Sequence, residues 1–333
     1  MKGNPFTSQS FERNWIKHYC KDQKITSFDF LRNVKFTKTK IWPIYVNIGK
    51  NFTNGITYDI NNEVIDFKGK VALIYDVQDF NTVEAPTRSR IKLNKVRQYE
   101  AYYGDLSERK SIEEVITANF NSSKSRYNFR RSLKQLNEAV DLKVDYFYGD
   151  IEKDAYIKYM QLFKDLLNKR FDDKSEFNTV LPMWDFYTDL IYDMILEKRV
   201  VLNVLSNGEE PIAMSINFVT DQAISVAIRT FDIAYNKLNI GNIEIYKLIE
   251  WCLENDIKMI DFSKGEGLYK TRWTEIEYHY DFHILYDSKS LYASIVGITL
   301  TKFFKFKQYL RDKEVNTWVI KLKYFKKRLL GQK

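Results

Sequence analysis

The sequence predicts an α+β fold, and three observations carry this prediction. Strand-length apolar runs follow one another at Val200–Leu205, Ile212–Val219 and Ala223–Thr230, with an Asn207-Gly208 turn between the first two. Segments with apolar residues at helical spacing lie before and after these strands. Glycine and proline are sparse, at 12 and 5 residues in 333, so no part of the chain is typical of a disordered tract. A chain of this length can form two domains, each with a core.

The first 110 residues are predicted to begin with a helix and continue with strands. The helix is expected near Ser8–Lys21, and strands are expected at Ile41–Ile48, Val71–Tyr75 and Lys92–Tyr103. We expect residues 1–110 to form an N-terminal domain.

Three helices are predicted in the next segment. The first runs from Ile112 to Val140, with an apolar stripe and a neighbouring basic stripe that contains Arg126, Arg130 and Lys134. The other two are expected at Lys153–Phe171 and Trp184–Lys198. The basic stripe either binds an anionic substrate or is a solvated helix face, and the sequence alone leaves both interpretations open.

The segment after the predicted strands has the layout of a binding site. Asn242–Asn255 has helical spacing, and Gly241 precedes it, where a bare backbone lets an anion approach the unpaired N–H groups of the first turn. Ile257–Phe262 reads as a buried strand, and Asp261 lies near the end of that strand, where ligands often collect in sheet proteins. The alternative is an ordinary loop glycine and a structural carboxylate. A last strand near Glu277–Leu285 completes a domain spanning residues 111–290.

The positive charge of the chain is concentrated at its C-terminus. The formal net charge is +8, and residues 301–333 carry 11 Lys or Arg against two acids. Trp318, Leu322, Phe325 and Leu329 recur there at helical spacing between lysines, which predicts a basic amphipathic helical tail over residues 291–333. Such a helix can bind an anionic membrane surface or RNA, or it can pack on the fold with solvated lysines.

The cysteine content and the apolar runs predict a cytoplasmic protein. Cys20 and Cys252 are the only cysteines, too few for a disulfide framework. The first ten residues lack the apolar core of a signal peptide, and Leu291–Leu300 is about half the length that spans a bilayer. We therefore expect a soluble protein, cytoplasmic and at most peripheral to the inner membrane face.

One block of motifs resembles a known family. Its members show the pattern that stands here as Phe231-Asp232, Asn239-Ile240-Gly241, Asp261-Phe262, Gly265-Glu266, Tyr269-Lys270 and Trp273, with Ser122–Arg126 and Arg130-Arg131 upstream. These residues resemble the GNAT-superfamily acetyltransferases of the CelD (BcsL, cellulose-biosynthesis-type) family, which is related to the Fem peptidyltransferases. The resemblance covers about residues 112–285. Asn239-Ile240 replaces a Ser-Pro, and an acidic pair that often follows Gly265 is reduced to Glu266.

The resemblance implies tandem GNAT-like, Fem-like domains and transfer of an acyl group to an amine. Glu266 and Asp261 are then the candidate bases, Tyr269 the candidate acid for a departing thiolate, and Gly241 with Asn242 the cofactor-binding turn. Lys270, Arg272, Arg126 and Arg130 would bind an anionic acceptor. A backbone N–H on Ser225–Arg229 would stabilise the oxyanion.

The donor and the acceptor follow from the same resemblance. We expect acetyl-CoA or another acyl-CoA as donor, and an amino sugar of a cell-surface polysaccharide precursor as acceptor. Fem relatives use aminoacyl-tRNA, so a peptidyltransferase remains an alternative, although the chain has no space for the helical arm that many of them carry. A non-catalytic carbohydrate-binding protein on the same fold is a third interpretation, suggested by the single Glu266.

Other chemistries are disfavoured by the sequence. His279 and His283 would lie roughly 13 Å apart along a strand, too far to bind one metal ion together. No Gly-Lys-Ser/Thr phosphate loop and no Gly-x-Ser-x-Gly elbow occurs. We therefore expect no metal site and regard nucleic acid as a poor partner.

Overall fold

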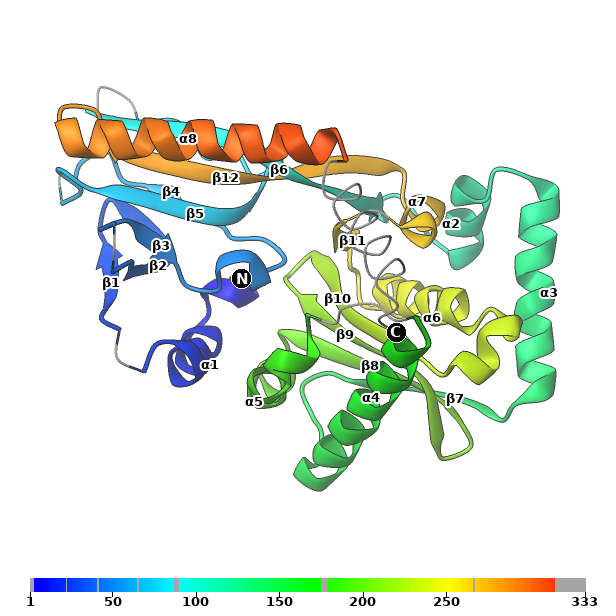
Figure 1. Ribbon diagram of the computed structural model, residues 1–333. Helices are drawn as coiled ribbons and strands as arrows, with labels where there is room; N and C mark the ends of the chain where they lie inside the picture. The colour runs from blue at the N-terminus through cyan, green and yellow to red at the C-terminus, as the bar shows by residue number, and fades with distance from the viewer. Residues whose placement is uncertain are drawn as a thin grey trace, which may run out of the picture. The chain divides into compact units, whose positions relative to one another are not determined.

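The computed structural model describes residues 3–21, 23–40, 42–64, 66–86, 90–174, 179–265 and 267–314 (Figure 1). The chain divides into two compact units. Unit 1 comprises residues 1–22, 52–54 and 100–278, and unit 2 comprises residues 23–51, 55–99 and 279–333. The domain boundaries expected near residues 110 and 290 remain predictions.

A mixed sheet forms the centre of unit 1. Its strands are β7 (Leu142–Phe147), β8 (Val200–Asn207), β9 (Glu210–Val219), β10 (Ala223–Phe231), β11 (Met259–Lys264) and the last residues of β6 (Ile91–Asp105). They lie in the order β6-β11-β10-β9-β8-β7. The β10–β11 pair is parallel, whereas the other neighbouring pairs are antiparallel. The hairpin strands expected around Asn207-Gly208 are confirmed.

Helices cover both faces of this sheet (Figure 1). They are α1 (Gln9–Tyr19), α2 (Ile112–Asn119), α3 (Ser123–Ala139), α4 (Lys153–Lys174), α5 (Trp184–Leu196), α6 (Ile240–Glu254) and α7 (Leu268–Trp273), with 3-10 turns at Pro5–Thr7, Leu181–Met183 and Ile233–Leu238 (η4). Val201 and Leu205 pack toward α6, and their neighbours Leu202 and Val204 are fully buried on the opposite face. Because successive strand residues point to opposite faces, a strand with both sets buried must be covered on both sides.

The single helix predicted over 112–140 is wrong: it is two helices. Phe120 ends α2 and turns into the core, where its ring contacts those of Phe129 and Trp273. Ser122 then starts α3 with a capping box. The Ser122 side chain accepts from the Ser125 N–H, and the Ser125 side chain accepts from the Ser122 N–H. The helical spacing continues across this break, which hides it in the sequence.

Unit 2 is a second sheet region with one long helix. Its strands are β1 (Ile25–Phe28), β2 (Leu31–Lys38), β3 (Tyr45–Asn47), β4 (Asp59–Ile60), β5 (Val71–Gln78), most of β6 and most of β12 (Ile276–Asp287). The order is β1-β2-β3-β5-β12-β6, with β4 beside β2. Helix α8 (Leu291–Asp312) lies along these strands and buries Ala293, Val296 and Phe304 against them (Figure 1). The α+β class is therefore confirmed in both units.

Candidate active site

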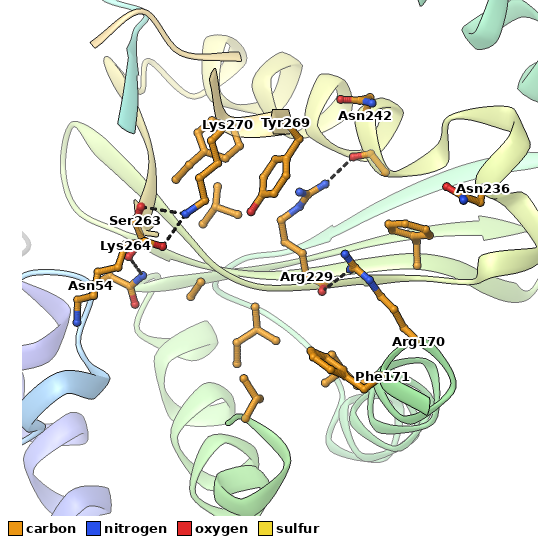
Figure 2. Close-up of a pocket in the computed structure, with 18 of the residues that line it drawn as sticks. Asn54, Arg170, Phe171, Arg229, Asn236, Asn242, Ser263, Lys264, Tyr269 and Lys270 are labelled. Atoms are coloured by element: carbon orange, nitrogen blue, oxygen red, sulfur yellow. Dashed lines mark hydrogen bonds between the residues drawn. The ribbon is translucent and has the colours of Figure 1, made fainter. Parts of the chain in front are cut away.

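A pocket of unit 1 opens where β10 and β11 stop pairing (Figure 2). These parallel strands share three register pairs, the last of which joins Ser225 to Asp261. Beyond that pair, residues 226–231 of β10 and 262–264 of β11 separate. A pocket of about 480 Å³ lies here and is lined by Asn54, Leu167, Arg170, Phe171, Val180, Val226, Ala227, Ile228, Arg229, Phe231, Asn236, Asn239, Gly241, Asn242, Phe262, Ser263, Lys264, Tyr269 and Lys270. We call it the β10–β11 pocket.

A β-bulge lies in the wall of this pocket. Val226 is in register with Asn217 of β9, and Ile228 is in register with Ile216, so Ala227 is the extra residue. Bulges re-aim the backbone and are frequent beside active sites. The expected oxyanion donor, a backbone N–H between Ser225 and Arg229, falls on this bulge and remains a prediction.

The start of α6 forms another wall. Asn239 adopts a left-handed conformation with φ 61°, and the helix begins at Ile240. The sequence predicted that Gly241 precedes the helix, which is wrong: Gly241 lies inside the first turn. The N–H groups of Asn242 and Ile243 both donate to the Asn239 carbonyl oxygen, at 3.0 and 3.2 Å. The first-turn donors left for an anion are therefore those of residues 240 and 241.

Gly241 is also constrained by packing. A Cβ at this position would lie 2.9 Å from Cε1 of Phe231, which is closer than real side chains approach. Asn242, the second predicted cofactor-binding residue, lines the pocket. Its Oδ1 accepts from the Trp273 indole at 3.0 Å, which ties α7 to α6. Both residues line the pocket, and their cofactor-binding role remains a prediction.

A buried ion pair crosses the floor of the pocket. Arg229 Nε donates to Glu244 Oε2 at 2.7 Å. Arg229 Nη2 donates to the Gly241 carbonyl oxygen at 2.5 Å (Figure 2). Glu244 is 1% exposed, and its other oxygen accepts from Ser215 Oγ at 2.6 Å and from Asn203 Nδ2 at 3.2 Å. The pair therefore fixes β10 to the start of α6. Glu244 can be buried on α6 although it is charged, because Arg229 supplies a partner of opposite charge.

Lys270 holds the loop after β11. Its Nζ donates to the carbonyl oxygens of Ser263 and Lys264, at 3.1 and 2.6 Å (Figure 2). It also donates to the Gly265 carbonyl oxygen at 2.8 Å. Burial lowers the pKa of Lys270 to about 8, and Arg229 acts in the same direction, while Asp261 opposes them. Lys270 lines the pocket, but these three bonds give its ammonium group a structural task beside the predicted role in acceptor binding.

The predicted catalytic residues occupy different positions. Tyr269 lines the pocket, is 37% exposed, and its ring lies 5.0 Å from the Arg229 guanidinium. Asp261 is fully buried behind the wall, outside the lining set, where its Oδ1 accepts from Tyr278 Oη and from the Ser263 N–H, each at 2.7 Å. Burial raises the pKa of Asp261 to about 6. Glu266 lies outside the described residues.

The structure does not bring Arg126, Arg130 and Arg272 into the pocket lining. Arg126 donates to the Phe120 carbonyl at 2.7 Å, and Arg272 lies over the Phe120 ring at 6.0 Å. Arg130 forms an exposed ion pair with Glu113 at 2.6 Å. These arginines surround the α2–α3 junction, so their predicted part in acceptor binding needs an acceptor that extends beyond the pocket.

Sequence reasoning missed two arginines that do line the pocket. Arg170 on α4 donates to the Arg229 carbonyl at 3.1 Å and lies 4.5 Å from the centre of the Phe231 ring (Figure 2). Arg229 alternates with apolar residues on β10, which gave a weak signal that it faces a pocket. With Lys264 and Lys270 the lining contains four cationic side chains, and the described lining contains no carboxylate. The pocket is therefore suited to an anionic ligand.

One protein family and several solved structures are similar to this chain. The family described as an acetyltransferase (GNAT) domain matches residues 123–271. A solved structure of FemX has 8% identity and a TM-score of 0.56, covering 85% of this chain and 92% of its own. A conserved protein of unknown function from Bacteroides thetaiotaomicron has 14% identity and a TM-score of 0.54, with the same coverage of 85% and 92%.

A third structure, L-PGS from Bacillus licheniformis, has 12% identity and a TM-score of 0.49 over 90% of this chain and 98% of its own. No curated protein sequence gives a significant match. At these identities the structural likeness concerns the fold, which FemX shares. Residues 123–271 thus match an acetyltransferase domain of the GNAT type, and the expectation of an acyltransferase enzyme is confirmed at that level.

Proposed function

We propose that this protein transfers an acyl group from acyl-CoA to an amine. The observation that carries the proposal is the β10–β11 pocket, which lies between the diverging ends of two parallel strands and reaches the start of α6. Diverging strands expose backbone N–H and C=O groups that are free to bond the amide groups of an extended donor. The helix start and the cationic lining are suited to the phosphates of that donor.

The reaction needs one bond to form and one to break. The amine nitrogen attacks the thioester carbonyl carbon, the C–N bond forms, and the C–S bond breaks to release the thiol. A backbone N–H at the Ala227 bulge would stabilise the oxyanion, and the Tyr269 hydroxyl would protonate the departing sulfur. The ammonium proton would pass to water or to Glu266, since the described lining contains no carboxylate. Asp261 would then act by positioning rather than as the base.

The acceptor in this proposal is an amino sugar of a cell-surface polysaccharide precursor made in the cytoplasm. Support comes from the resemblance to the CelD family and from the cationic lining, which favours an acceptor with phosphate or carboxylate groups. Of the four cations in the lining, Lys264 and Lys270 are the nearest to Tyr269 along the chain. Arg126, Arg130 and Arg272 would contact a longer acceptor outside the pocket.

One observation favours a different donor. Two N–H groups of the first turn of α6 are already bonded to Asn239, and the turn contains a single glycine. A pyrophosphate therefore finds fewer backbone donors here than a glycine-rich turn supplies. An aminoacyl-tRNA, which places an ester rather than a pyrophosphate in the pocket, is the second candidate donor, and the enzyme would then be a peptidyltransferase.

Calorimetric titration of the full chain with acetyl-CoA, coenzyme A and a tRNA pool separates the two donors. Micromolar acetyl-CoA binding that is weakened at least about tenfold by Lys264→Glu, which reverses a lining charge, supports the acyl-CoA proposal. The matched control is Lys258→Glu, because Lys258 is outside the lining and pairs with Asp256. Binding of tRNA without acetyl-CoA would support the peptidyltransferase, and no binding of either would contradict both.

A further inference from the structure

Helix α8 has an apolar face that unit 2 does not bury. One side of the helix, including Val296, Gly297 and Phe304, packs against the unit 2 strands, and Gly297 allows close contact with the Tyr286 ring. The opposite side exposes large apolar residues. We define the α8 outer face by these residues and their exposed fractions: Leu291 80%, Tyr292 37%, Ile295 55%, Ile298 44%, Phe303 55%, Phe306 59% and Tyr309 56%.

The α8 outer face is also strongly basic. Lys302, Lys305, Lys307 and Lys313 are all exposed along its second half. Asp312 is the single acidic residue of α8, and Arg97 pairs with it at 3.3 Å. Exposed aromatic rings and lysine ammonium groups therefore alternate along one side of a helix that is about 33 Å long at 1.5 Å per residue.

We propose that the α8 outer face binds an anionic lipid bilayer surface, with the helix lying flat in the headgroup region. Apolar rings enter the acyl boundary while the lysines on the same side reach the phosphates, since long lysine side chains extend to bring their charge to the interface. A protein partner would need acidic groups interleaved with apolar ones at this spacing. A bilayer presents both chemistries continuously, so charge complementarity and a long exposed apolar row together select it.

This mode of binding differs from membrane spanning. Within the described residues, no helix has the length and apolarity required to cross a bilayer. From the sequence, the membrane contact was expected in the basic tail at residues 301–333, of which 315–333 lie outside the described residues. The α8 outer face overlaps the start of this range and extends upstream to Leu291, on a helix whose inner side is fixed to unit 2. The proposal does not depend on the acyl-transfer reaction.

Vesicle co-flotation of the full chain tests this proposal. Vesicles of phosphatidylcholine with phosphatidylglycerol in a 3:1 ratio should bind the protein, and pure phosphatidylcholine vesicles should bind it much less. Lys305→Glu with Lys307→Glu should weaken binding by at least about 30-fold, because each lysine near an anionic surface contributes roughly fivefold. Lys143→Glu with Lys158→Glu makes the same charge change on exposed residues of unit 1 and should leave binding unchanged.

The apolar contribution needs its own variant. Phe303→Ser with Phe306→Ser should reduce binding to the anionic vesicles at least about tenfold, while circular dichroism stays unchanged because both rings are exposed. Ile157→Ser is the matched control, since Ile157 is 53% exposed on α4. Equal binding by the phenylalanine variant and the wild type would overturn the proposal. The proposal would also be overturned if the wild type bound no vesicles and formed a dimer, and if the phenylalanine variant were a monomer. The α8 outer face would then bind a second copy of the chain.

Discussion

Replacing Glu244 by alanine should remove a large part of the stability of unit 1. The carboxylate is 1% exposed and carries the Arg229 ion pair, with a side-chain exposure of 13% for Arg229. The substitution leaves the guanidinium buried with the Gly241 carbonyl as its remaining acceptor on α6. It also leaves the Ser215 hydroxyl and the Asn203 amide without the oxygen that they share.

The expected cost follows from these contacts. Breaking a buried ion pair by removing one partner costs about 3–5 kcal/mol, because an uncompensated charge stays in a poorly solvated site. This is at least about a fifth of the stability of a typical domain, which is about 5–15 kcal/mol. Equilibrium unfolding in urea, followed by tryptophan fluorescence and by circular dichroism, measures the free energy of unfolding. Acetyl-CoA affinity should fall in the same variant, since the start of α6 loses its tie to β10.

Glu250→Ala is the control on the same helix. Glu250 pairs with Lys247 at 2.7 Å, but the two side chains are 27% and 26% exposed, so its loss should cost less than about 1 kcal/mol. If Glu244→Ala and Glu250→Ala destabilise the protein equally, the buried pair does not hold the pocket floor and the reasoning fails.

Four further outcomes are expected. Lys270→Met should cost about 2–4 kcal/mol of unfolding free energy in urea, because three carbonyl oxygens lose a charged donor. Burial raises the pKa of Asp261 from 3.8 to about 6, so the folded state holds a proton that the unfolded state releases. The proton bound by Asp261 therefore stabilises the folded state fully below about pH 4, and this stabilisation is lost as the pH rises to 6. Between these pH values the free energy of unfolding of the wild type should fall by on the order of 3 kcal/mol more than that of Asp261→Asn. Tyr269→Phe should lower kcat about 100-fold without changing the KM for acetyl-CoA in a steady-state assay, whereas an unchanged kcat would exclude the phenol as the acid. Gly241→Val should cost about 1–3 kcal/mol in thermal or urea unfolding, because the new side chain collides with Phe231.

Long periodic segments made much of the fold predictable. The strands at 200–230, the α6 helix and β11 were found because apolar residues recur over enough positions to set the period. Strand β2 was missed because its burial alternates irregularly and its exposed positions carry Arg32, Lys35 and Lys38. The break at Phe120 was missed because it depends on contacts with Phe129 and Trp273, and Trp273 is more than 150 residues away in the chain.

The site was predictable where it lies in one continuous motif. Gly241, Asn242, Tyr269 and Lys270 were all proposed from the sequence, and all four line the pocket. Arg170 was not found, because its place depends on how α4 packs against β10, and no local pattern encodes that packing. Long-range burial decides such positions, and a single sequence contains no direct record of it.

Asp261, predicted as a catalytic base, also has a structural role at the end of β11. Its Oδ1 accepts the N–H of Ser263, two residues further on, which is an Asx-type turn. Ser263 has a φ of 57°, a left-handed conformation that ends the extended path of β11. This turn comes directly after the last register pair, Ser225 with Asp261, so the bend directs β11 away from β10. The Asp261 carboxylate therefore stabilises the turn at the end of β11, and Ser263 in that turn lines the pocket. Under the proposed function, the backbone at the Ala227 bulge and the Tyr269 hydroxyl would then carry the transfer.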